Sequence, residues 1–312
     1  MSGPSVVALG GGHGLAASLA ALRHVTDHIT AVVTVADDGG SSGRLRREFD
    51  VLPPGDLRMA LSALTEDTEW GHLWRDVLQH RFHGDGELGG HALGNLLIVS
   101  LWEQLGDTVS GLDMVGRLLN ARGRVLPMAA VPLTIRADVM GEDPARPLDI
   151  SVVTGQVEVA TTTGRVLSIS LDPEEPPACE EAVSAVDEAD WVVLGPGSWF
   201  TSVMPHLLVP GLRDAIVATG ARRLLTLNLQ MHTGETEGFS AENHLEVLAA
   251  HAPDLHLDVV LADPRVVTDE KLLRRVCEGL GADLVVAPVA ATDHPGQHDE
   301  LRLAAAYRDV LA

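Results

Sequence analysis

Apolar runs alternate with helix-like segments along most of this chain. Residues 5–9, 29–35 and 190–194 are largely apolar, which is typical of strands buried on both faces of a parallel sheet. Glycines and an Ala/Leu-rich segment ending near Leu22 follow the first run and predict a turn and a helix. Later strands of the same kind are expected at 224–229, 257–262 and 284–287. The alternation predicts a Rossmann-like α/β fold with a doubly wound, mostly parallel sheet.

The pattern changes between residues 131 and 172. Short runs of alternating apolar and polar residues, each predicting a strand, are separated by polar or glycine turns and lie at 132–140, 148–153, 156–160 and 166–171. Such alternation is typical of an antiparallel sheet with one face in solvent. We therefore expect a single domain over 1–312, in which a small antiparallel β insertion (131–172) separates a first α/β part (1–130) from a second (173–312).

Composition narrows the class of partner. The 312 residues carry a formal net charge of −22, and only 3% are aromatic. This disfavours nucleic acid and anionic membranes, although a local site can still bind phosphates. No apolar run is long enough to cross a membrane, and the first residues lack the basic segment of a signal peptide. Cys179 and Cys277 lack the spacing of a redox or metal motif, so we expect a cytoplasmic protein.

The densest polar cluster follows the second predicted strand, in residues 32–46 (VVTVADDGGSSGRLR). Gly39 and Gly40 allow a sharp turn or the close approach of a ligand. Asp37 and Asp38 supply carboxylates that could bind ribose hydroxyls or a hydrated cation. Ser41 and Ser42 supply hydroxyls at a helix start, and Arg44 and Arg46 supply guanidinium donors. The strand–glycine–helix context favours ligand binding over the alternative, a solvated turn that caps a helix.

The first glycine loop, residues 10–15 (GGGHGL), resembles a dinucleotide-binding turn only in part. Gly10 and Gly12 fit the G-x-G-x-x-G fingerprint, but Leu15 stands where its third glycine would be. A nicotinamide-dependent dehydrogenase is therefore disfavoured. His13 either donates to a phosphate or only occupies space.

Three further segments carry candidate chemistry. Residues 53–58 (PPGDLR) place Asp56 and Arg58 at a helix start, either as a cap beside a surface arginine or as a polar wall of the site. Asn95 follows a glycine at another helix start. Residues 195–202 (GPGSWFTS) form a second strand-to-glycine loop, which could face the first loop across one cleft.

Several long motifs together resemble the YvcK family, also called the gluconeogenesis factor or CofD-like family. The motifs are GGGHGL (10–15), AVVTVADDGGSSGRLR (31–46), PPGDLR (53–58), HRF (80–82), GHALGNLL (90–97), RGRVLP (122–127), GPGSWFTSVMPHLLVPG (195–211) and GETEGFSAENHL (234–245). They extend over most of the chain to about residue 251.

The resemblance implies a Rossmann-like core and a regulatory function. Some members bind nucleotide sugars, notably UDP-N-acetylglucosamine. They support cell-wall precursor supply and cell shape during growth on gluconeogenic carbon sources, as regulators without catalysis. The alternative is the related CofD branch, which transfers a 2-phospho-L-lactate group to the precursor of a deazaflavin coenzyme. The motifs at 31–46 and 90–97 look like the YvcK branch.

The resemblance also implies a set of residues around the cleft. By matching motif these are Gly11, Gly12, Asp37, Asp38, Ser41, Ser42, Asp56, Asn95, Gly195, Gly197, Ser198 and Thr201, and the chemistry of His13, Arg44 and Arg58 adds them to the ligand-binding set. No catalytic residue is expected. Mg²⁺ could bridge a nucleotide diphosphate and Asp37 or Asp38. A protein partner in cell-wall precursor synthesis is expected, and the Ala/Leu/Val-rich helices are compatible with a homodimer.

Overall fold

The computed structural model describes residues 3–230, 234–294 and 296–312. A seven-stranded sheet runs through the protein in the order β10-β9-β8-β7-β1-β2-β3, and every neighbouring pair is parallel. Its strands are β1 (Val6–Gly10), β2 (Ile29–Val33), β3 (Arg124–Pro127), β7 (Trp191–Leu194), β8 (Arg222–Thr226), β9 (Val259–Ala262) and β10 (Asp283–Val286). Every residue of β1, β7 and β9 is buried, as the apolar runs predict.

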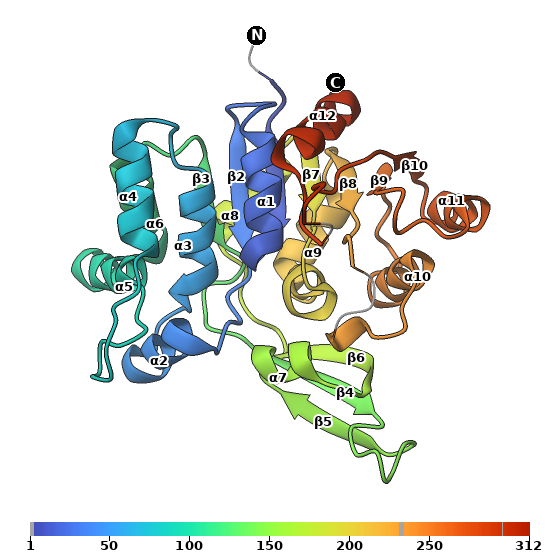
Figure 1. Ribbon diagram of the computed structural model, residues 1–312, viewed down its shortest axis with the longest axis horizontal. Coiled ribbons are helices and arrows are strands. Elements are labelled where there is room, and N and C mark those ends of the chain that lie inside the picture. The colour runs from blue at the N-terminus through green and yellow to red at the C-terminus, as the bar shows by residue number, and fades with distance from the viewer. Residues whose placement is uncertain (1–2, 231–233, 295) are drawn as a thin grey trace.

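Helices cover both faces of this sheet (Figure 1). The helices on the viewer's side are α1 (Gly12–Leu22), α3 (Pro54–Ala63) and α12 (Glu300–Leu311), and those behind the sheet are α8 (Glu180–Asp187) and α9 (Pro210–Ala218). Toward the two ends of the sheet lie α2 (Gly40–Phe49), α4 (Glu69–Gln79), α5 (Leu93–Leu105), α6 (Thr108–Leu118), α10 (Ala241–His251) and α11 (Glu270–Gly279). None of the described helices is long and apolar enough to cross a membrane.

The strand order reverses between β1 and β7. From β1 the chain adds β2 and β3 on one side, and from β7 it adds β8, β9 and β10 on the other. The doubly wound α/β prediction is therefore confirmed. In such sheets ligands bind outside the carboxyl ends of the strands, where the order reverses. The two strands at this point are followed by the two glycine loops, residues 11–14 and 195–198.

The insertion forms a separate three-stranded antiparallel sheet in the order β5-β4-β6. Its elements are β4 (Thr134–Met140), β5 (Ile150–Thr154), α7 (Gln156–Thr161) and β6 (Arg165–Asp172). This sheet and α7 lie beyond the carboxyl edge of the main sheet, at the bottom of Figure 1. The insertion therefore lies on the side of the molecule where the glycine loops are.

The strand predicted at 156–160 is wrong, because this segment is the helix α7 (Gln156–Thr161). Val157 and Val159 fit the two-residue alternation of a strand. The helix has too few residues to show the 3.6-residue period that would distinguish it. A distant side chain stabilises the helix: the Asp38 carboxylate accepts hydrogen bonds from the amides of Gln156 (3.0 Å) and Val157 (3.3 Å). These amides are the free donors of the first helical turn.

The sequence prediction also missed β3, the edge strand of the main sheet. Its four residues directly follow Arg122 and Gly123 and end on a proline, so the run is too short to show a period. It becomes a strand because it pairs in parallel with β2 over Thr30–Val33. Proline is tolerated there because edge strands have one unpaired side.

Candidate ligand-binding site

The two glycine loops are in direct contact at the β1–β7 crevice. A Cβ atom on Gly14 would overlap the carbonyl oxygen of Pro196 and lie 2.6 Å from the Cα of Gly197. Asn228, just beyond β8, holds the second loop: it accepts from the Gly197 amide (2.8 Å) and donates to the Gly197 carbonyl (2.7 Å). Only a glycine at position 14 allows this approach, so the loops form one continuous wall.

A first cavity, of about 230 Å³, lies where α2, α3 and α5 begin. We call it the charged cavity, because ionisable side chains of both signs line it: Asp37, Asp56, Arg58 and Arg81. Gly39–Gly40, Ser41, Ser42 and Asn95 also contribute to its lining. Residues that lie far apart in the sequence thus meet at the starts of three helices, where backbone amides favour an anion.

A buried hydrogen-bond network supports the charged cavity. Arg58 Nε donates to Asn95 Oδ1 (2.8 Å), and Asn95 Nδ2 donates to Ser41 Oγ (3.0 Å). The Ser41 hydroxyl also bonds to His91 Nδ1 (2.9 Å). Ser41 Oγ accepts from Asn95 and also from the Ala92 amide (3.4 Å), which occupies both of its lone pairs. Its single proton then goes to His91, and Nδ1 is the unprotonated ring nitrogen. Burial lowers the pKa of His91, in agreement with a neutral ring.

The two carboxyls of the charged cavity are electrostatically coupled. Burial raises the pKa of Asp37, although hydrogen bonds from the Gly39 amide and the Ser42 hydroxyl lower it in part. Burial and the neighbouring charge of Asp37 raise the pKa of Asp56 to about 7, although the Gly12 amide donates to it. Asp56 is therefore a carboxyl that takes up and releases a proton near neutral pH.

Arg58 has donor capacity that the described residues do not use. Its side chain is 3% exposed, and burial lowers its pKa to about 10. Its Nη1 atom has no hydrogen-bond partner among those residues. A buried guanidinium nitrogen without a partner is costly, and this one has almost no accessible surface, so a ligand would reach it only if the side chain moved.

A second cavity, of about 450 Å³, lies on the other side of the loop wall. Its polar lining comes from His13, Ser198, Asn228, Gln230, Gln297 and His298, and the described residues contribute no Asp, Glu, Lys or Arg to it. Burial lowers the pKa of His298 to about 4, so its ring is uncharged at neutral pH. We call this the neutral cavity.

The structure brings together part of the predicted site. Six predicted residues line the charged cavity, namely Asp37, Ser41, Ser42, Asp56, Arg58 and Asn95, and three line the neutral cavity, namely His13, Gly197 and Ser198. Gly11 and Gly12 lie between the two, close to the Asp56 carboxylate.

The other predicted residues have structural contacts. Both oxygens of Asp38 bind the amides of α7, and Arg44 binds the carbonyls of Glu87 (3.3 Å) and Gly89 (2.8 Å). Thr201, with only 2% of its surface exposed, accepts from Gln156 through its carbonyl. Gly195 is the first residue of the second loop and is buried. None of these four residues lines either cavity.

Sequence reasoning missed several lining residues. Asn228 and Gln230 directly follow β8, and the rule that ligands bind at carboxyl ends of strands could have singled them out. Arg81 belongs to the HRF motif but lies outside the predicted site set. Gln297 and His298 precede the last helix, and the sequence around them has no glycine signature that marks them as part of a site.

The side chains available as ligands limit how a metal ion could bind in the charged cavity. Among the described residues no group of three or more His, Cys, Asp or Glu side chains could hold a metal. Asp38 is occupied by amides, which leaves Asp37 and Asp56 as the carboxyls on the charged cavity. Mg²⁺ commonly binds through one or two carboxylates together with ligand phosphates. These residues fit Mg²⁺ in that form, with the ligand supplying the remaining oxygens.

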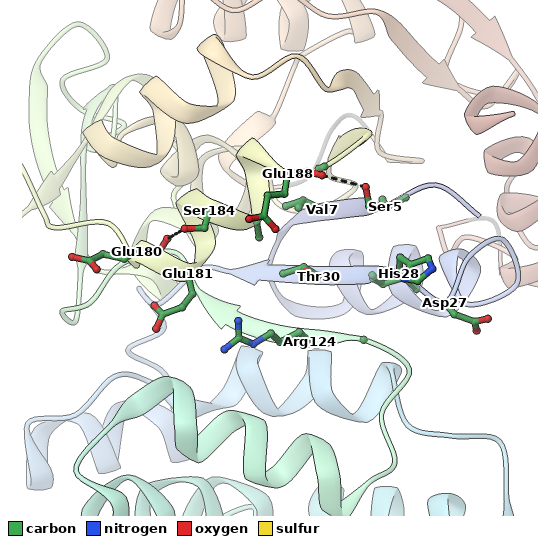
Figure 2. Close-up of a pocket in the computed structure, with 15 residues that line it drawn as sticks. Ser5, Val7, Asp27, His28, Thr30, Arg124, Glu180, Glu181, Ser184 and Glu188 are labelled. Carbon is green, nitrogen blue, oxygen red and sulfur yellow. Dashed lines mark hydrogen bonds between the residues drawn. The ribbon is translucent and has the colours of Figure 1, made fainter. Parts of the chain in front are cut away.

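Another cavity, of about 720 Å³, lies at the opposite edge of the sheet, near the starts of β1, β2 and β3. Figure 2 shows acidic side chains of α8 along one wall and Arg124 on the other. The Arg124 guanidinium is already bound through two nitrogens by Asp113, at 2.9 Å each. An acidic, open hollow at the amino ends of the strands offers an anion little, so its size does not make it the site.

Fold and cavities define a doubly wound α/β protein with two polar cavities at its switch point. A family model described as 2-phospho-L-lactate transferase CofD matches residues 6–302. The Bacillus subtilis protein named gluconeogenesis factor is 36% identical over 267 residues, covering 86% of this chain and 81% of the relative. The Mycobacterium tuberculosis protein named "Putative gluconeogenesis factor" is 54% identical over 310 residues, covering 98% of this chain and 90% of the relative.

The comparison with solved structures points to the same family. The crystal structure of a UPF0052-family protein from Bacillus halodurans superposes with a TM-score of 0.86 at 32% identity, covering 98% of this chain and 99% of that one. The chain belongs to the CofD family, and within it the chain is a homologue of the gluconeogenesis factors. The resemblance stated from the motifs is thereby confirmed.

Proposed function

We propose that this protein binds a nucleotide sugar of the UDP-N-acetylglucosamine type and regulates metabolism without turning its ligand over. It would act in the cytoplasm, where it links gluconeogenic growth to cell-wall precursor supply and cell shape through a protein partner. The relatives named gluconeogenesis factor support the metabolic part of this proposal.

One observation carries the ligand part: the charged cavity adjoins a glycine loop at the switch point and is lined by two guanidinium groups, those of Arg58 and Arg81. A diphosphate offers oxygens for these groups and for the amides at the helix starts. In the proposal Mg²⁺ binds together with the ligand, through Asp37.

The test is a thermal-shift series with UDP-N-acetylglucosamine, UDP-glucose, GDP and NAD, each with and without Mg²⁺. A ligand that binds only the folded state adds about 2.7 kcal/mol of stability at a hundredfold excess over its Kd, so binding is measurable. We expect UDP-N-acetylglucosamine to stabilise the protein and to be recovered intact. No stabilisation by any UDP-sugar would contradict the proposal.

The alternative is a phospholactyl transferase of the CofD type. The Asp56 carboxyl favours it, because a pKa of about 7 suits general acid–base chemistry at neutral pH. In the same series this activity predicts stabilisation by GDP with Mg²⁺. It further predicts consumption of a phospholactyl donor once a deazaflavin acceptor is added.

A further inference from the structure

Strand β5 is an outer edge of the insertion's sheet, at the bottom of Figure 1. Its sequence, Ile-Ser-Val-Val-Thr, contains no charged residue and no proline. Natural edge strands usually carry such residues or a bulge, because an unblocked edge pairs with another chain. The other edges of the described sheets have these features: β3 ends on Pro127, β10 begins with Asp283, and β6 begins with Arg165 and has an irregular register against β4. Nothing in β5 prevents further pairing.

The backbone groups of alternate β5 residues point away from the sheet. At the two ends of the strand the Gly155 amide donates to the Ile135 carbonyl (2.9 Å), and the Gly141 amide donates to the Asp149 carbonyl (3.0 Å). Bonded residues alternate in an antiparallel ladder, so the odd-numbered residues of β5 bond to β4. The amides and carbonyls of the even-numbered residues face the open edge and have no partner among the described residues; these are Ile150, Val152 and Thr154.

We propose that this edge binds the same edge of a second copy of the chain, so that two insertions form one continuous antiparallel sheet. A two-fold axis at Val152 places this residue opposite Val152 of the second copy, and Ile150 opposite Thr154 of the second copy. Each pair joins residues whose amides and carbonyls face outward, which is what an antiparallel ladder requires. This register pairs all three residues with one another, so every free backbone group of the edge gains a partner.

Charge favours a second copy as the occupant of this edge. The net charge of −22 makes two copies repel each other over most of their surface. β5 itself is uncharged. In the proposed register Asp149, which is ion-paired with Arg146 (3.4 Å), falls opposite Gly155 of the second copy and not opposite another carboxylate. Two copies therefore meet at β5 without like charges directly opposite, which would destabilise the pairing.

Exposed apolar side chains add contact across the same edge. Ile150 is 62% exposed and Val152 is 65% exposed, and both project from one face of the strand because they are two residues apart. In the two-fold register the Val152 side chains of the two copies become direct cross-strand neighbours on that face. Such pairs of β-branched side chains stabilise a sheet, so side chains and backbone favour the same arrangement.

Sedimentation of the full chain over a range of concentrations tests the assembly. The unaltered chain should form a dimer, and Val152→Pro should be monomeric, because proline removes the outward amide and leaves the bonds of Ser151 and Val153 to β4 in place. Leu301→Ala removes an exposed leucine (67%) from α12; it is the matched control and should stay dimeric. Unchanged circular dichroism of each variant shows that the fold is retained.

Two charge variants test the register. Val152→Lys and Val152→Asp each place like charges opposite one another across the two-fold axis, so each variant alone should be monomeric. An equimolar mixture should form a heterodimer, because opposite charges then face each other. Both variants keep the backbone amide, so they test the proposal even if the proline variant does not fold.

Hydrogen exchange measures the same pairing at single amides. On dilution of the unaltered chain the Val152 amide should lose protection, while the Val153 amide, which bonds within the chain, keeps it. An unaltered chain that is monomeric at every concentration would overturn the proposal, as would a dimer that Val152→Pro and Val152→Lys leave intact. A mixture of the charge variants that stays monomeric would overturn the register at Val152. None of these measurements involves a ligand, so their outcome is independent of the proposed function.

Discussion

At the scale of single residues, Gly14 shows how close packing sets the shape of the site. Glycine inside a helix normally lowers stability relative to alanine by roughly 0.5–1 kcal/mol. At position 14 of α1 that preference is reversed, because a methyl group would collide with the carbonyl of Pro196. The site therefore keeps a residue that the helix alone would disfavour.

We predict opposite effects for two glycine-to-alanine substitutions in helices. Gly14→Ala should lower the free energy of unfolding by about 1–3 kcal/mol, as expected for overpacking. Gly116→Ala in α6 is the matched control: its nearest neighbours lie 3.9 Å or more from the added Cβ, so stability should stay constant or rise. Urea unfolding of both variants measures the difference, and equal effects would refute the account.

Asp56 predicts a pH dependence of stability. Its pKa is raised from 3.8 to about 7 in the folded protein, so the folded state holds the proton more tightly than the unfolded chain. Stability from this group is fully present below about pH 4 and is lost as the pH rises to about 7. Asparagine cannot ionise, so Asp56→Asn should reduce the fall in melting temperature between pH 5 and pH 8.

The control for this experiment is Asp254→Asn, an exposed carboxyl outside both cavities. Its melting temperature should follow that of the unaltered protein at each pH. An unchanged pH profile in Asp56→Asn would show that the group does not titrate between pH 4 and 7.

At the scale of elements, α7 is held by a residue outside the insertion. Asp38 follows β2 of the main sheet, yet its carboxylate caps the first turn of α7. The insertion is thereby attached to the polar stretch that also supplies Asp37 to the charged cavity. A ligand in that cavity would thus lie close to the contact between the two sheets.

Asp38→Ala should uncap α7. We expect a loss of about 0.5–2 kcal/mol in the free energy of unfolding, as for other helix caps, and faster hydrogen exchange at the amides of Gln156 and Val157. Asp254→Ala serves as the control and should change neither quantity. Unchanged exchange at both amides would mean that the carboxylate does not hold the helix.

Longer elements followed from the sequence more reliably than short ones. The runs at 5–9 and 29–35 became β1 and β2, and the Ala/Leu-rich segment ending near Leu22 became α1. The segments at 124–127 and 156–160 were missed or misassigned, because partners distant in the sequence decide them. Four or five residues carry too little periodicity to outweigh such partners.

At the scale of the whole molecule, Tyr307 joins the end of the chain to its beginning. This fully buried residue of α12 places its hydroxyl 2.9 Å from Ser18 Oγ in α1 and 3.1 Å from Thr226 Oγ1 in β8. It lines neither cavity. The single tyrosine of the chain is thus part of the core that holds both halves of the sheet together.

Tyr307→Phe removes the hydroxyl and leaves two buried partners with one contact fewer. The free energy of unfolding should fall by about 1–2 kcal/mol, while the affinity for UDP-N-acetylglucosamine should not change. Leu301→Ala on the same helix, where 67% of the leucine is exposed, should have little effect on either. A loss of affinity in Tyr307→Phe without a loss of stability would place the tyrosine at the ligand instead.

Fold class, family and the polar loops that follow the strands could be predicted from the sequence, because apolar periodicity and contiguous motifs are local properties of the chain. Tertiary structure decided which polar residues share a cavity. It joined Asp37, Arg58 and Asn95 at three helix starts and directed Asp38 and Arg44 to structural contacts. It also brought Gln230 and Gln297 to one wall, since side chains distant in sequence meet only where the order of the strands places them.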